Sequence, residues 1–152
     1  MLMKPIVALM MQYSETVPGA FDIDPGYLRL LEFAGANVLT VDPSDDDGYL
    51  RSMLDRADGL LIPGGNDIDP SLYGGRHLPV NSVHHQAVHR AGEGVEVQAT
   101  AADGIIESAY RPDRDFFMAV QWHPEQTPAD EPSRRLARAF TEACRTYGEH
   151  HA

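Results

Sequence analysis

A histidine and a glutamate two residues apart follow an apolar stretch in the second half of the chain. The segment reads Val120-Gln121-Trp122-His123-Pro124-Glu125. Residues two apart in extended backbone face the same side, and proline favours extended backbone, so we expect Glu125 to approach the imidazole of His123. A carboxylate there fixes the tautomer of the ring, which is the base-and-orienter half of a nucleophilic triad. By spacing alone, a surface His–Glu pair is an equally good interpretation.

Two further stretches carry groups that can hold a polar ligand. Gly64 and Gly65 follow an apolar run and Pro63, and glycines there let backbone N–H groups turn toward an oxyanion or a carboxylate. The alternative is a Gly-Pro loop that only leads out of a strand. The second stretch is a run of polar side chains able to hydrogen-bond a ligand, with the order Asn81, Ser82, Val83, His84, His85 and Gln86.

The histidines and the single cysteine limit the metal and disulfide chemistry. His85 and His89 are four apart and could share a metal on a helix, but no supporting carboxylates lie nearby in sequence. His84 and His85 would point in opposite directions on a strand. We therefore expect no metal and no cofactor. Since Cys144 is the only cysteine, an intrachain disulfide is excluded, and the count suits a reducing cytoplasm.

Length, composition and charge narrow the class of protein. The 152 residues are 43% hydrophobic and 23% charged, which is typical of one globular domain over residues 1–152. The net charge of −11 repels phosphate backbones and anionic lipids, so we expect no nucleic-acid partner. The apolar run at 6–11 is shorter than a signal-peptide core, and no run approaches the length of a membrane span. The sequence thus favours a cytoplasmic protein without membrane association.

The first part of the chain alternates strand and helix patterns. Strands are predicted at residues 6–10, 37–41 and 59–62, the first and third as apolar runs, and helix patterns at 25–34 and about 48–56 separate them. The first helix is expected to begin at Asp24-Pro25 and to end at Gly35. This order predicts a parallel sheet covered by helices.

The second part of the chain changes character. From Val80 onward, alternation and an Asp103-Gly104 turn predict antiparallel strands over 95–99, 105–108 and 116–122. A last helix is expected to begin at Glu131. The residues predicted to dock it on the sheet are Leu136, Ala139, Phe140, Ala143 and Tyr147.

Taken together, the motifs resemble the γ-glutamyl-γ-aminobutyrate hydrolase family of the class I glutamine amidotransferase-like superfamily. The matching stretches are, in chain order, residues 63–65 with Asp67, 69–74, 81–88, 103–107 and 121–125. The resemblance implies a shortened three-layer α/β/α fold with central parallel strands and an antiparallel carboxyl-terminal portion. It also implies a small-molecule γ-glutamyl substrate, as in polyamine and γ-aminobutyrate catabolism, and a Cys-His-Glu triad. His123 and Glu125 match the triad, Gly64 and Gly65 match the oxyanion loop, and residues 81–86 match the substrate side.

One part of the family's pattern is missing. Members carry a Gly-Ile-Cys-Arg-Gly-like nucleophile elbow, with its strand and helix, between the stretches that correspond to residues 69–74 and 81–88. Here only Gly75 to Val80 separate them, and six residues cannot hold a crossover of about a dozen or more. We therefore expect an internal deletion near residues 75–80. Cys144 lacks a flanking glycine turn and is interpreted as a structural or partly exposed thiol, while Ser71 and Ser82 have no evident activation.

Three functional hypotheses follow. The leading one is a family member that has lost hydrolytic competence because the nucleophile is absent. The alternative is a non-catalytic binding or regulatory module for γ-glutamyl compounds or glutamate, and the third is a hydrolase with another nucleophile or a partner's cysteine. Since the missing strand lies in the middle of the family's sheet, the sheet re-pairs, exposes its edges or borrows a second chain. A homodimer is one arrangement that satisfies the last case.

Overall fold

The computed structural model describes residues 3–14, 16–44, 46–63 and 87–151. The chain divides into two compact units, residues 1–63 with 128–152 and residues 64–127. Each unit has its own sheet, parallel in the first and antiparallel in the second. Among the described residues, none of the helices combines the length and the apolar character needed to span a bilayer.

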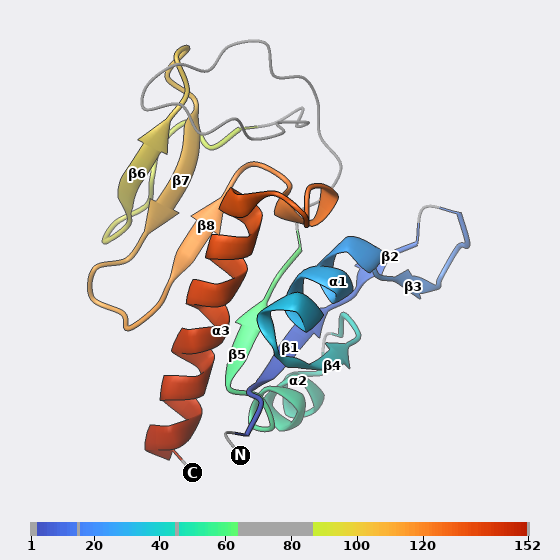
Figure 1. The fold of residues 1–152 in the computed structure, drawn as a ribbon. Helices are drawn as coiled ribbons and strands as arrows, with labels where there is room; N and C mark the ends of the chain where they lie inside the picture. Colours follow the sequence, from blue (N-terminus) through green and yellow to red (C-terminus); the bar gives the residue numbers. More distant parts are fainter. Residues whose placement is uncertain (1–2, 15, 45, 64–86, 152) are drawn as a thin grey trace. The chain divides into compact units, whose positions relative to one another are not determined.

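The first unit is built on a three-stranded parallel sheet (Figure 1). The middle strand, β1 (Ile6–Met10), pairs with β4 (Asn37–Val41) on one side and with β5 (Gly59–Leu61) on the other. Val7, Ala8 and Leu9 of β1 are fully buried, because a middle strand of a parallel sheet is covered on both faces. The three predicted strands and their parallel order are confirmed.

Side-chain caps set the ends of the first two helices. α1 (Pro25–Ala34) begins where the Asp24 side chain accepts the Gly26 N–H at 2.6 Å, and it ends at Gly35 in the left-handed conformation, φ 83°. α2 (Asp47–Leu54) is capped by Asp46, which accepts two backbone N–H groups. The predicted bounds of α1 are confirmed, and α2 begins one residue earlier and ends two residues earlier than expected.

The loop between β1 and α1 contains a short hairpin that the sequence did not predict. β2 (Gln12–Tyr13) pairs with β3 (Phe21–Asp22) in an antiparallel manner. The rings of Tyr13 and Phe21 lie 5.1 Å apart. Two-residue strands are too short to show an alternating pattern, so periodicity could not reveal them.

The long last helix, α3 (Glu131–His151), packs on α1, β1 and β5. Its buried residues are Ser133, Ala137, Thr141 and Cys144. The prediction for its docking face is wrong in part, because Ala139 is exposed and Tyr147 is 48% exposed. The buried face consists of small residues because α3 runs close to β5: a Cβ placed on Gly59 would overlap Cys144 Sγ.

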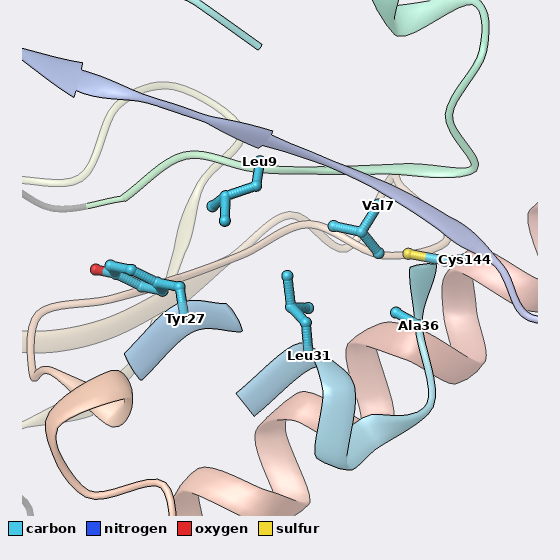
Figure 2. Packing of buried hydrophobic residues seen from close by; sticks show 6 residues of the cluster. All are labelled: Val7, Leu9, Tyr27, Leu31, Ala36 and Cys144. Atoms are coloured by element: carbon cyan, nitrogen blue, oxygen red, sulfur yellow. The ribbon is translucent and has the colours of Figure 1, made fainter. Parts of the chain in front are cut away.

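The core of the first unit joins the sheet to α1 and α3 (Figure 2). In Figure 2, Val7 and Leu9 of β1 point toward the side of Leu31 of α1. Tyr27, Ala36 and Cys144 complete the buried cluster, with the half-buried residues Ile23, Val38, Leu61 and Phe140 packed around it. The buried cluster and the residues around it hold β1, β4 and β5 in place. The loops that follow these strands leave from their carboxyl ends.

The second unit holds an antiparallel sheet in the order β6-β7-β8 (Figure 1). The strands are β6 (Glu96–Thr100), β7 (Ile106–Tyr110) and β8 (Met118–Val120). The turn before β7 places Gly104 at φ 90°, and the Ala101 N–H donates to Ile105 O at 2.8 Å, so three residues form the loop. The predicted antiparallel strands and the turn are confirmed. β6 lies one residue later than the predicted 95–99, β7 begins one residue and ends two residues later than the predicted 105–108, and β8 is shorter than the predicted 116–122.

Candidate active site

The segment that carries His123 leaves the antiparallel sheet where β8 ends. The Gln121 N–H donates to Glu107 O at 2.8 Å, which extends the contact of β8 with β7 by one residue. A single 3-10 turn, η1 (Pro124–Gln126), follows His123. The prediction of extended backbone through Glu125 is wrong, because the fixed φ of Pro124 suits the first position of a helical turn equally well. The anchoring of Gln121 on Glu107 had no signal in the sequence.

The turn nevertheless brings the two side chains together. His123 Nδ1 and Glu125 Oε1 are 2.6 Å apart, and the side chains are 12% and 3% exposed. The expected approach of Glu125 to the ring is therefore found, and the pair is not a surface pair. Since a carboxylate oxygen can only accept, a neutral His123 ring donates its Nδ1–H to Glu125 and leaves the lone pair on Nε2. The arrangement orients an imidazole that can take a proton at Nε2.

Two polar atoms beside this pair are buried without a hydrogen-bond partner among the described residues. They are Glu125 Oε2 and the indole nitrogen of Trp122. Buried polar atoms in folded proteins nearly always have a partner, and the exceptions often have a functional explanation. One acceptor on the carboxylate that orients His123 and one donor on the preceding residue in the chain are thus left without a partner in the described part of the protein.

Cys144 lies in the other unit, and its surroundings are those of a core residue. It is 3% exposed and belongs to the cluster of Figure 2. Burial raises the pKa of the Cys144 thiol to about 11, and the charge of Asp58 adds to the shift. Since a nucleophilic thiol needs access and a lowered pKa, this environment agrees with the structural interpretation.

Several predicted residues fall outside the part of the chain that the structure describes. They are Gly64, Gly65, Ser71, Asn81, Ser82, His84, His85 and Gln86. His89 is described and is exposed. Within the described ranges, no group of three histidine, cysteine, aspartate or glutamate residues is arranged to hold a metal. The described part of the candidate site therefore consists of His123, Glu125 and their neighbours.

We expect the neutral form of His123 to carry its proton on Nδ1, since Glu125 accepts from that atom. The long-range ¹H–¹⁵N correlations of the imidazole at alkaline pH measure the tautomer. Replacing Glu125 with alanine should move the proton largely to Nε2, whereas Glu131→Ala, which removes a carboxylate that is 65% exposed, should leave it on Nδ1. An imidazole that is Nε2-protonated in the unaltered protein would contradict the assigned donor.

The chain is similar to a known protein family and to curated proteins of that kind. The sequence model of the Peptidase C26 family matches residues 5–79 and 75–125, in two segments that overlap at residues 75–79. The putative glutamine amidotransferase Rv2859c of Mycobacterium tuberculosis is 41% identical over 73 residues, which are 48% of this chain and 23% of that protein. The γ-glutamyl-γ-aminobutyrate hydrolase PuuD of Escherichia coli (strain K12) is 34% identical over 73 residues, 47% of this chain and 27% of that protein. The matches thus span about a quarter of these curated relatives.

A solved structure supports the fold class. A putative GMP synthase protein from Thermoplasma acidophilum superimposes with a TM-score of 0.68 at 16% sequence identity. The match covers 97% of this chain and 98% of that one. The α/β fold with a parallel central sheet and antiparallel carboxyl-terminal strands, as predicted, is confirmed.

Proposed function

The chain belongs to the Peptidase C26 family, and from this premise we propose that it is a glutamine amidotransferase-like protein without hydrolytic activity. It keeps the base and the orienting carboxylate of a γ-glutamyl amide hydrolase and lacks the nucleophile. The observation that carries the proposal is the 2.6 Å contact between His123 Nδ1 and Glu125 Oε1. In cysteine-dependent amide hydrolysis, such an imidazole accepts the thiol proton while the sulfur attacks the carbonyl carbon.

The sequence offers that imidazole only one thiol. Cys144 is the single cysteine of the 152 residues, and its place in the core makes it inaccessible to a substrate. A pKa raised to about 11 leaves only a very small thiolate fraction at neutral pH. Without a thiolate there is no acyl-enzyme, and the pair at the end of β8 has no proton to accept.

An internal deletion in a single family domain explains the missing nucleophile. The family match comes in two segments that overlap at residues 75–79, and this supports a deletion in the stretch 75–80, where the family has a strand, an elbow and a helix. Under this proposal Gly64 and Gly65 remain as the oxyanion loop. Residues 81–86 remain as the substrate side of the site.

A second candidate function is non-catalytic binding of γ-glutamyl compounds or glutamate. The observation that favours it is the pair of buried, unpartnered atoms beside His123, namely Glu125 Oε2 and the Trp122 indole nitrogen. A ligand with an amino group and a carbonyl would satisfy both atoms, and hydrogen bonds to such groups make binding selective.

Incubation of the full chain with γ-glutamyl-γ-aminobutyrate tests the proposal. We expect glutamate release, followed with a coupled dehydrogenase assay, to be no higher than for a His123→Ala variant. Glutamate release by the unaltered chain that is lost in the His123→Ala variant would overturn the proposal. If a Cys144→Ser variant also lost this release, Cys144 would be identified as the nucleophile. A raised unfolding temperature with substrate but no release would favour the binding module.

A further inference from the structure

A hollow in the first unit is formed by residues that the candidate active site does not use. It has a volume of about 420 Å³ and is lined by Met10, Tyr13, Pro43, Ser44 and Leu50. Met10 is the last residue of β1, and Pro43 and Ser44 follow β4. The hollow thus lies at the carboxyl ends of two adjacent parallel strands, the edge at which open α/β sheets bind ligands. Its volume falls within the usual range for small-molecule sites.

Hydrogen bonds and ring contacts hold the walls of this hollow. The Asp42 N–H donates to Tyr49 Oη at 3.3 Å, and Asp46 caps α2, so the loop after β4 is tied to the first turn of the helix that carries Leu50. On the other side, Tyr13 is held by the β2–β3 pairing and by its ring contact with Phe21. The walls are therefore formed before any ligand arrives, which lowers the entropic cost of binding.

The lining is mostly apolar, and its surroundings are acidic. Met10, Pro43 and Leu50 supply apolar surface, while Tyr13 presents an aromatic ring that is 71% exposed. The lining residues of the β4 loop stand within the stretch Asp42–Asp47, which has four aspartates, and the three that the structure describes are exposed. Between residues 5 and 50 the only basic side chain is Arg29, and Arg51 follows on α2, so the four aspartates outnumber the nearby basic residues in the sequence. A cation is attracted by these carboxylates and by the face of an aromatic ring, and an anion is repelled.

We propose that this hollow binds an organic ammonium ion with a short apolar chain. The chain contacts Met10 and Leu50, and the ammonium group stays at the rim, near the Tyr13 ring and the aspartates of the β4 loop. This site is independent of the function proposed above, since it involves neither His123 nor Glu125.

Three ligands with the same chain and different charge test the site. Hexylammonium, hexanol and hexanoate are titrated into the full chain, and the Met10 methyl group and the Ser44 and Leu50 amides are followed by NMR. We expect saturable shifts with hexylammonium and binding at least about tenfold tighter than for hexanoate, a difference that shrinks as salt rises from about 20 to about 500 mM. Equal binding of the three ligands, shifts spread over other residues, or a chain without a folded spectrum would each overturn the proposal.

Matched variants separate a defined site from general attraction to an acidic chain. Ser44→Lys places an ammonium group in the lining and should weaken hexylammonium binding about tenfold or more. Thr146→Lys makes the same charge change on an exposed position of α3 and should leave it within about twofold. Tyr13→Ala removes an aromatic ring that is 71% exposed, and should weaken binding several-fold. Equal effects of the two lysines, or no effect of Tyr13→Ala, would contradict the site.

Discussion

Leu31→Ala is expected to reduce the free energy of unfolding by about 3 kcal/mol, whereas Leu28→Ala on the same helix should cost less than about 1 kcal/mol. Leu31 is 1% exposed and belongs to the buried cluster with Val7 and Leu9 of β1 (Figure 2). Truncation there leaves a cavity that the β1 strand and α3 cannot fill without moving. Leu28 is 38% exposed and lies outside the buried cluster, so its truncation leaves no enclosed cavity.

Urea unfolding followed by far-UV circular dichroism measures both variants against the unaltered chain. The two proteins carry the same change of residue type three positions apart in α1, so helix propensity cancels between them. Equal losses of stability would contradict the described burial of α1. A measurable difference requires a cooperative transition, and such a transition would show that the chain builds a packed core in spite of the missing elbow.

The elements of the first unit were predictable because their signals are local. β1 appears at the predicted residues 6–10, since a strand covered on both faces needs a continuous apolar run. β4 also appears at the predicted residues 37–41, although its Asn37 and Thr40 are exposed. α1 has its predicted ends because Asp24 and Gly35 are cap residues whose conformations depend on their own side chains. In these cases one short stretch of sequence contains the whole physical cause.

Features that depend on distant contacts were not predictable in the same way. The docking face of α3 is set by how closely it approaches β5, so Ser133 and Thr141 are buried while Tyr147 is exposed. Hydrophobicity alone predicts that Tyr147 is buried. It carries no information on the space that Gly59 leaves between β5 and α3. A helix that packs closely on its neighbours selects small side chains in preference to apolar ones.

The candidate site was predictable in composition more than in geometry. The sequence indicated that Glu125 orients His123, yet the route is a 3-10 turn at Pro124 and not an extended strand. His123 precedes the turn with a non-helical backbone, φ −103° and ψ 84°, so its ring still reaches Glu125, and the spacing alone could not distinguish this path from an extended one. The buried state of the pair, at 12% and 3% exposure, depends on the fold of the second unit and had no signal in the segment itself.

Gly59→Ala is expected to destabilise the first unit by about 2–3 kcal/mol, although alanine favours most folded backbones over glycine. The added Cβ would overlap Cys144 Sγ and would lie 3.4 Å from Phe140 Cε2. Since Gly59 begins β5 and Cys144 is buried in α3, the overlap is relieved only if Cys144 leaves its rotamer within the packed core or the strand moves away from the helix. Gly92→Ala is the matched control, because its Cβ would have no heavy atom within 4 Å, and it should change stability by less than about 0.5 kcal/mol.

A double-mutant cycle identifies the sulfur as the cause. Cys144→Ala removes Sγ and by itself should cost about 1 kcal/mol of lost packing. In the double variant the new Cβ at Gly59 meets Cys144 Cβ and Phe140 Cε2, both at the ordinary distance of 3.4 Å, so the double variant should be more stable than Gly59→Ala alone. Additive losses in urea unfolding would mean that β5 and α3 do not pack through this pair. A favourable coupling of about 2 kcal/mol would place the single thiol of the chain in its core and out of reach of any substrate.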